Sequence, residues 1–393
     1  MTHKIIKFLH HITVVIPLLF VVSPAYADNA SVSQLISFEN EFESLFSELS
    51  SSFDSGSTWK GQTKYISCLH SIKTKQWSAC IKYLDQIKNT DPGYSSDLSH
   101  ILYGISYHNN DETQQAFDHY RQIPSSSSYY IHAQLYIALL HVRYSRPQKA
   151  NRLITRLLLT NSDRIAPEMK NKLHLIQGYL YFLSKDFLSS RNALQKVSVN
   201  SQYINDATAS LALTHIYQGD YESAKKYLSY LSVKSVKDTP ADTAYVLLAF
   251  AHSQENAFSE STMASYRNAI KYYKKRIAEI DSLMAGEIGL PIINSPSSSR
   301  LFIIENNMLD LSQTLPESFL SNYASLARVT LKTPASGKRD NLYKETARLH
   351  KHYERAIVTE ARQQLLTRKN MLSRYLNQCM YTLARLLYQN KLQ

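Results

Sequence analysis

The feature that most restricts the fold of this chain is a recurrence of small residues at nearly constant spacing. Cys68, Gly104, Ala138, Gly178 and Ala212 stand 36, 34, 40 and 34 positions apart. A period near 34 is typical of helix-turn-helix units, because no such unit can bury its apolar face alone. We therefore expect stacked helix pairs, and the few turn formers, 9 Gly and 11 Pro in 393 residues, favour long helices.

Other positions recur in step with the last four small residues. Three positions after each of them comes a residue with a ring, twelve positions after it a second small residue, and sixteen positions after it a large residue. These residues are Tyr107, His141, Tyr181 and His215; Ala116, Ala150, Ser190 and Ala224; and Tyr120, Ile154, Leu194 and Leu228. Antiparallel helices approach closely only where the facing residues are small, so these positions predict the crossings. Lys185-Asp186-Phe187 and Gly219-Asp220-Tyr221 predict turns that begin second helices.

With this register, the stretch from Trp59 to Met284 resembles the tetratricopeptide repeat (TPR) family. The family pattern runs aromatic, Leu-Gly, Tyr, then Ala, Phe, Pro; here the leading tryptophan is missing, and His141 and His215 replace tyrosine. The resemblance implies an all-α, TPR-type α-solenoid of about five helix-turn-helix units, which we assign to residues 59–285.

Two departures from a constant period are expected to shape the repeat. The wider spacing between Ala138 and Gly178 predicts a longer loop from Thr160 to Pro167. The last unit is predicted to pair a helix over Asp242 to Ser253 with a longer helix over Ser261 to Met284.

In the TPR family the first helix of each pair lines a concave groove, and the resemblance implies a protein-binding groove here. The projected groove residues are apolar or aromatic: Leu135, Leu139, Leu175, Tyr179, Phe182, Leu213 and Tyr217. An apolar segment of a protein partner would suit such a surface. Alternatively, the chain's own N-terminal helix around Phe38 and Phe42, or its C-terminal helix, fills the groove.

The chain has 3 Cys. Cys68 and Cys80 occupy the two small positions that face each other across the first helix crossing, so a disulfide between them is predicted. The alternative is that both are small buried residues. Cys379 is expected to be a buried thiol or, less often, an intermolecular crosslink.

The first residues have the order of a secretory signal. Lys4 and Lys7 precede an apolar run from Ile12 to Val22, and Ala25-Tyr26-Ala27 follows. We expect a signal peptide over residues 1–27, cleaved after Ala27, and a periplasmic protein; a retained membrane anchor is the alternative. Cleavage would lower the formal charge from +12 to +10, because it removes two lysines and no acid (12 − 2).

The remaining segments complete the predicted organisation. Residues 28–58 are expected to form an N-terminal helix and a Ser-rich linker, 286–300 a Pro/Gly/Ser linker, and 301–393 a basic helical region. Within the last, Leu301 to Leu331 predicts one or two helices. Asp340 to Leu392, without Gly or Pro, predicts one helix of up to about 53 residues, or a hairpin broken near Gln363 to Asn370.

Charge favours a contact surface over a catalytic site. From Lys338 to the end, 12 Lys or Arg face 4 Asp or Glu, a local charge of +8 (12 − 4). The common metal, acyl-transfer and phosphate-binding motifs are absent, so we expect no enzyme, no metal, no cofactor and no small-molecule substrate. The expected function is a scaffold or adaptor that binds protein partners in the cell envelope, and nucleic acid is not an expected partner. The alternative is a structural protein that contacts an anionic membrane or cell-wall surface through the basic C-terminal helix.

Overall fold

The computed structural model describes residues 60–73, 76–90, 96–234, 237–286, 288, 301–311, 323, 325–326 and 340–391. These residues fall into two compact units that divide between Tyr203 and Ile204, within the predicted repeat region. We call them the N-terminal unit and the C-terminal unit. The predicted signal peptide, the helix over 28–58 and nearly all of the 286–300 linker lie outside the described residues.

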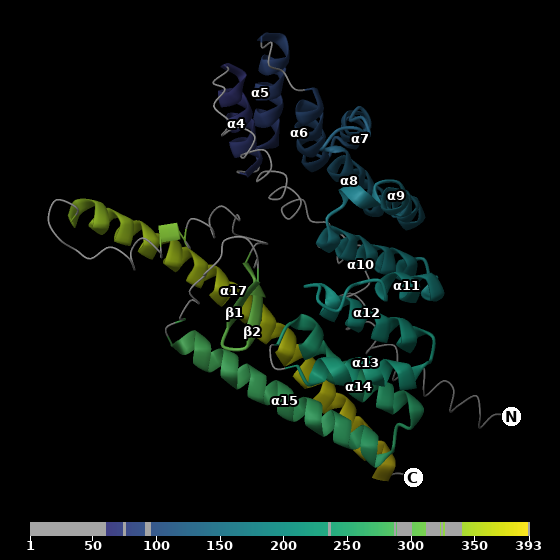
Figure 1. Ribbon diagram of the computed structural model, residues 1–393. Helices are drawn as coiled ribbons and strands as arrows, with labels where there is room; N and C mark the ends of the chain where they lie inside the picture. The colour runs from purple at the N-terminus through teal and green to yellow at the C-terminus, as the bar shows by residue number, and fades with distance from the viewer. Residues whose placement is uncertain are drawn as a thin grey trace. The chain divides into compact units, whose positions relative to one another are not determined.

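The N-terminal unit is a series of helix pairs (Figure 1). Each first helix packs against the second helix of its own pair, and each pair packs against the next. The helices are α4 (Lys60–Lys73), α5 (Trp77–Thr90), α6 (Ser96–Asn109), α7 (Thr113–Arg121), α8 (Tyr130–Arg143), α9 (Pro147–Thr160), the 3₁₀ helix η1 (Ser162–Arg164), α10 (Pro167–Leu183) and α11 (Phe187–Leu194).

The C-terminal unit adds two further helix pairs, a β-hairpin and one long helix. Its elements are α12 (Ile204–Tyr217), α13 (Tyr221–Ser232), α14 (Thr239–Glu255), α15 (Glu260–Ala285), β1 (Leu301–Ile304), β2 (Asn307–Asp310) and α17 (Asp340–Lys391). The all-α solenoid architecture predicted from the period is confirmed, including both helices of the fifth unit.

The small residues lie where the two helices of a pair cross. A Cβ placed on Gly104 would lie under 3.0 Å from three ring atoms of Tyr120, and one on Gly178 would overlap Cγ and Cδ2 of Leu194. Both partners are the large residues predicted sixteen positions later, and both are buried. At these two crossings, no residue other than glycine fits without a shift of its neighbour.

The turn within each pair repeats the same backbone geometry. Asp111, Ser145, Lys185 and Gly219, each seven positions after a small residue, all have left-handed φ angles, from 55° to 76°. One residue later, the backbone N–H donates to the carbonyl five residues before it, over 2.8 to 3.0 Å. This closing bond satisfies a carbonyl that the end of the first helix leaves free. The second helix then begins at the next residue in every case, as the turn motifs predicted for α11 and α13.

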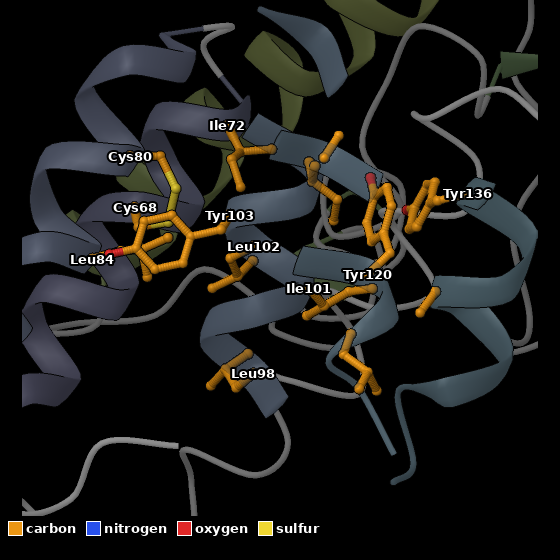
Figure 2. Close-up of a cluster of buried hydrophobic side chains, with 14 of the residues drawn as sticks. Cys68, Ile72, Cys80, Leu84, Leu98, Ile101, Leu102, Tyr103, Tyr120 and Tyr136 are labelled. Carbon is orange, nitrogen blue, oxygen red and sulfur yellow. A yellow bond between two sulfur atoms is a disulfide. The ribbon is translucent and has the colours of Figure 1, made fainter. Parts of the chain in front are cut away.

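The buried aromatic core of the N-terminal unit joins its first pairs. In Figure 2, a disulfide between Cys68 and Cys80 links α4 to α5, and Tyr120 lies beside Tyr136. The Tyr120 and Tyr136 rings stack with centroids 5.4 Å apart, and both are fully buried. Tyr65 on α4 connects this core to α6, because its hydroxyl lies 2.5 Å from Oγ of Ser99.

The prediction of a longer loop between Ala138 and Gly178 is wrong. The connection over 161–166 is no longer than the one over 122–129; the helices grow instead. Helix α9 has 14 residues against 9 in α7, and α10 has 17 against 14 in α8. Arg164 fastens the connection by donating from Nη1 and Nη2 to the carbonyls of Ser125 and Ser127.

The prediction of helix from Leu301 onward is also wrong for residues 301–310, which form a two-stranded antiparallel hairpin. Ile304 pairs with Asn307, and the intervening Glu305 and Asn306 have φ angles of 43° and 65°. Two consecutive residues with positive φ make the turn whose twist matches a hairpin. Lys237 continues the pairing, because its N–H donates to Asn306 O and its carbonyl accepts from Met308 N.

Helix α17 is continuous over 52 residues, so the predicted single helix is confirmed and the hairpin alternative is not formed. It packs along α15 and touches α14, as Figure 1 shows for the gold and green helices. One stripe of α17 is buried: Ile357, Ala361, Leu365, Leu372, Tyr375, Cys379 and Leu386. The C-terminal helix therefore covers the last helix pair, α14 and α15. The alternative in which it fills the predicted groove stays a prediction.

Candidate functional site

The residues predicted to line a groove lie on first helices of the repeat pairs, namely α8, α10 and α12. Five of the seven are at most 7% exposed: Leu135, Leu139, Leu175, Tyr179 and Leu213. Helices that are apolar on all sides become buried on all sides, and α8 and α12 are of this kind. These five side chains pack the repeat, and their role in binding a partner stays a prediction. Phe182 is half-buried and Tyr217 is 37% exposed.

An accessible apolar patch surrounds Phe182 at the turn between α10 and α11. The rings of Phe182 and Phe187 meet edge to face, with centroids 5.6 Å apart, and the neighbouring Leu188 is 60% exposed. We call these three residues the turn-edge patch. The family's groove positions led to Phe182 and missed Leu188, which is signalled only by its place directly after the turn aromatic.

The turn itself holds the patch in place. The carboxylate of Asp186 accepts a hydrogen bond from the backbone N–H of Ser189 over 3.1 Å, which caps the start of α11. Ser190 donates to the carbonyl of Gly178 over 2.8 Å, so the second helix is also fastened to the first at their crossing. The patch therefore lies on a rigid turn.

A polar contact also links turns of neighbouring pairs. Nη2 of Arg143, at the end of α8, lies 2.5 Å from Oδ1 of Asp111, in the turn of the preceding pair. Nη1 of the same guanidinium donates to the carbonyl of His108 over 3.3 Å. This bridge, together with the contact between Thr113 and Tyr144, keeps the two turns in register.

Histidines and tyrosines gather on α6 and α7. The Nδ1 atoms of His100 and His119 lie 2.9 Å apart, and the His119 ring stacks on Tyr103 and Tyr107. Burial and then the neighbouring His100 lower the pKa of His119 to about 4, and burial likewise lowers the pKa of His100. Both imidazoles are therefore neutral at pH 7, one donating and the other accepting. The two Nδ1 atoms bind each other, and the stacked rings pack α6 against α7.

A buried group of charged side chains in the C-terminal unit surrounds Asp242 on α14. Its carboxylate is fully buried, and Oδ2 lies 2.6 Å from Nε of Arg368 on α17. Oδ1 lies 3.7 Å from Nε of Arg276 on α15 and accepts a hydrogen bond from the hydroxyl of Tyr272. Burial, followed by the charge of Asp242, raises the pKa of Tyr272, so the phenol stays protonated. We call Asp242, Arg276, Arg368 and Tyr272 the ionic cluster.

The ionic cluster ties the hairpin to the helices. Nη2 of Arg276 donates to Oδ1 of Asn307 over 2.6 Å, and its Nη1 lies 2.6 Å from Oε2 of Glu279. Nη1 of Arg368 donates to the carbonyl of Met308 over 3.3 Å. Two arginines thus share one buried carboxylate, and each also donates one hydrogen bond to the hairpin. The sequence had given Asp242 only as the start of a helix.

Comparisons with known proteins show a likeness to solved structures and to no family model. No protein-family model and no curated protein matches the sequence. Among solved structures, the chain is similar to the apo form of the quorum sensor NprR from B. thuringiensis, with 12% sequence identity and a TM-score of 0.40 over 89% of this chain and 95% of that one. At this level of similarity, the fold assignment rests on the helix pairs themselves.

Two searches of the described residues complete the description. No group of three or more His, Cys, Asp or Glu side chains within them is arranged to hold a metal ion. No described helix is both long and apolar enough to cross a membrane.

Proposed function

We propose that this chain is an exported member of the TPR family that acts as a non-catalytic scaffold and binds an apolar segment of a protein partner in the cell envelope. The observation that carries the proposal is the repeated turn, with a left-handed residue at the same position and the same closing bond in four consecutive pairs. Within a unit, helix pairs held by such turns present side chains at regular intervals to a partner.

The turn-edge patch is the proposed contact. Phe182, Phe187 and Leu188 offer aromatic and aliphatic surface on a capped turn, and anchors of this kind dominate the binding energy of protein interfaces. Tyr217, which occupies the predicted groove and is partly exposed, is a second proposed contact. Since the other groove residues are buried, a partner would bind along the turns and not along the inner helix faces.

The test is crosslinking and pull-down from envelope extract with the wild type and two variants. Phe182→Ala combined with Leu188→Ala removes most of the patch. Val199→Ala is the matched control, because Val199 is an apolar residue of the same unit that is 78% exposed and lies outside the patch. We expect a partner that the wild type and the control retain and that the double variant loses. An unchanged set of partners would reject the patch as the binding site.

The proposed compartment has its own test. The order of basic, apolar and small residues up to Ala27 supports export and cleavage. N-terminal sequencing of the protein from the periplasmic fraction is expected to begin at Asp28. An uncleaved N-terminus in the cytoplasmic fraction would reject this location.

A further inference from the structure

The last three turns of α17 present an apolar ridge on the side opposite the buried stripe. Met380, Tyr381, Leu387 and Tyr388 are 45%, 69%, 37% and 67% exposed. Their spacing of i, i+1, i+7 and i+8 places them on one side of the helix, whereas Cys379, Thr382 and Leu386 face the core. We call the four exposed residues the C-terminal ridge.

The stretch of α17 that carries the C-terminal ridge holds charge of one sign. No Asp or Glu follows Glu360, whereas six Lys or Arg do: Arg362, Arg368, Lys369, Arg374, Arg385 and Lys391. Arg368 and Lys369 are paired with Asp242 and Asp281, and Arg362 donates to a backbone carbonyl. Arg374, Arg385 and Lys391 have no acidic partner within the described part of the chain.

These three cations border the ridge. Arg385 lies four residues after Tyr381 and three before Tyr388, so it neighbours both rings on the helix surface. Arg374 lies two turns before Tyr381, and Lys391 one turn after Leu387. Apolar and tyrosine side chains flanked by unpaired cations characterise a helix that lies in the plane of an anionic membrane interface.

We infer that the C-terminal ridge docks on the surface of an anionic lipid bilayer, with the tyrosines and Met380 entering the headgroup region and Arg374, Arg385 and Lys391 on lipid phosphates. Tyrosine suits this depth, because its ring is apolar and its hydroxyl stays hydrated. The inference narrows the predicted contact with an anionic surface to seven residues. It does not rest on the scaffold function, whose main proposed contact, the turn-edge patch, lies in the N-terminal unit.

Other occupants fit the ridge less well. A second copy of the chain would bring two segments without acids against each other, and like charges oppose such pairing. A protein partner would have to bring acidic side chains to the three cations, whereas the phosphates of an anionic bilayer are present all over its surface.

The experiment is vesicle co-sedimentation of the full-length mature protein. Vesicles of phosphatidylcholine are compared with vesicles that also contain phosphatidylglycerol, at low salt and at about 0.5 M salt. The ridge variant is Tyr381→Ser with Tyr388→Ser, and the charge variant is Arg374→Gln, Arg385→Gln and Lys391→Gln. The matched control is Tyr230→Ser with Lys234→Gln, since Tyr230 is 50% exposed and Lys234 lies over its ring, 4.5 Å from the centroid.

We expect the wild type and the control to bind the anionic vesicles alone and to be released by salt. The charge variant should bind roughly a hundredfold more weakly, because it loses three surface cations, and the ridge variant roughly tenfold more weakly, because it loses two interfacial rings. Equal binding to neutral vesicles, no binding by the wild type, or full binding by both variants would overturn the inference. A dimer in sedimentation velocity that the ridge variant dissociates would assign the ridge to a second copy instead. A variant lacking the turn-edge patch should still bind vesicles, so failures of the two proposals are distinguishable.

Discussion

Nε of Arg368 lies 2.6 Å from Oδ2 of Asp242, so an ion pair between residues 126 positions apart fastens the long helix α17 to the last helix pair. Both side chains are at most 6% exposed. Because Arg276 shares the same carboxylate, the pair is part of the larger ionic cluster, and the loss of one member leaves other charges buried without their counterion.

Replacement of Asp242 by asparagine should therefore destabilise the C-terminal unit. We expect the free energy of unfolding to fall by about 3 to 5 kcal/mol, the usual cost of breaking a buried ion pair. Guanidinium denaturation followed by circular dichroism measures this change. Asp281→Asn is the control, because Asp281 pairs with Lys369 at the surface, and there the loss should stay below about 1 kcal/mol. Equal losses in the two variants would contradict the role given to the ionic cluster.

The crossing at Gly178 predicts a coupled effect. Gly178→Ala should lower the free energy of unfolding by about 1 to 3 kcal/mol, since the new methyl group overlaps the side chain of Leu194. Combination with Leu194→Val should cost less than the sum of the single changes, as measured in a double-mutant cycle by thermal unfolding. Gly219 has a φ of 76°, and a Cβ added there would meet no atom within 4 Å. The loss of unfolding free energy in Gly219→Ala, about 1 to 2 kcal/mol, therefore comes from the backbone. Additive costs at Gly178 and Leu194 would show that the two residues do not meet.

Stability should also depend on the protonation of His108. Burial, followed by the charge of Arg143, lowers the pKa of His108 to about 4 in the folded state. The unfolded chain, with an ordinary histidine pKa near 6.5, binds more protons between these values. The contribution of neutral His108 to the free energy of unfolding is therefore fully present above about pH 6.5. It falls as the pH drops toward 4, by no more than about 1.4 kcal/mol per pH unit.

Urea unfolding of the wild type and of His108→Asn at pH 7, 6 and 5 tests this dependence. The variant should lose less stability than the wild type between pH 7 and pH 5. Since carboxylates titrate in both proteins, the difference between their two pH profiles reports the effect of His108 alone. Parallel pH profiles would show that His108 is not responsible.

The cysteines predict a labelling pattern. Burial raises the pKa of the Cys379 thiol to about 12, so iodoacetamide should label no thiol of the native protein at pH 8. Denaturation without reductant should expose Cys379 alone, and denaturation with reductant should expose all 3 Cys. Reduction of the Cys68–Cys80 bridge should lower the free energy of unfolding by about 3 kcal/mol. Three labelled cysteines without reductant would contradict the bridge.

The repeat could be predicted from the sequence because its determinants are local and periodic. Small residues at the crossings and the turn residues seven positions later lie within one helix pair, so their spacing alone indicates where helices begin and meet. Gly104 with Tyr120, and Gly178 with Leu194, lie sixteen residues apart and were found by counting. The continuity of α17 also follows from the sequence, because the segment has no Gly or Pro.

Features that depend on distant parts of the chain could not be predicted in this way. Period alone indicates which face of α8 or α12 is apolar, but not what covers it, so the burial of Leu135 and Leu213 came from the structure. The apolar run that begins at Leu301 is too short to distinguish a strand from a helix, and the hairpin is decided by its turn. The polar residues from Gln363 to Asn370 suggested a break in α17; one of them, Arg368, is instead buried against Asp242.

The lengthening of α9 and α10 shows how a stack of this kind can change in size. The extra residues lie on both sides of the connection over 161–166, at the end of α9 and the start of α10, while the turn residues Ser145 and Lys185 and their closing bonds keep their place. Two neighbouring pairs can thus each lengthen one helix at the connection between them and keep the same turn geometry. For protein engineering, epitopes or reporter segments should be tolerated near the connection over 161–166 and rejected within the turns.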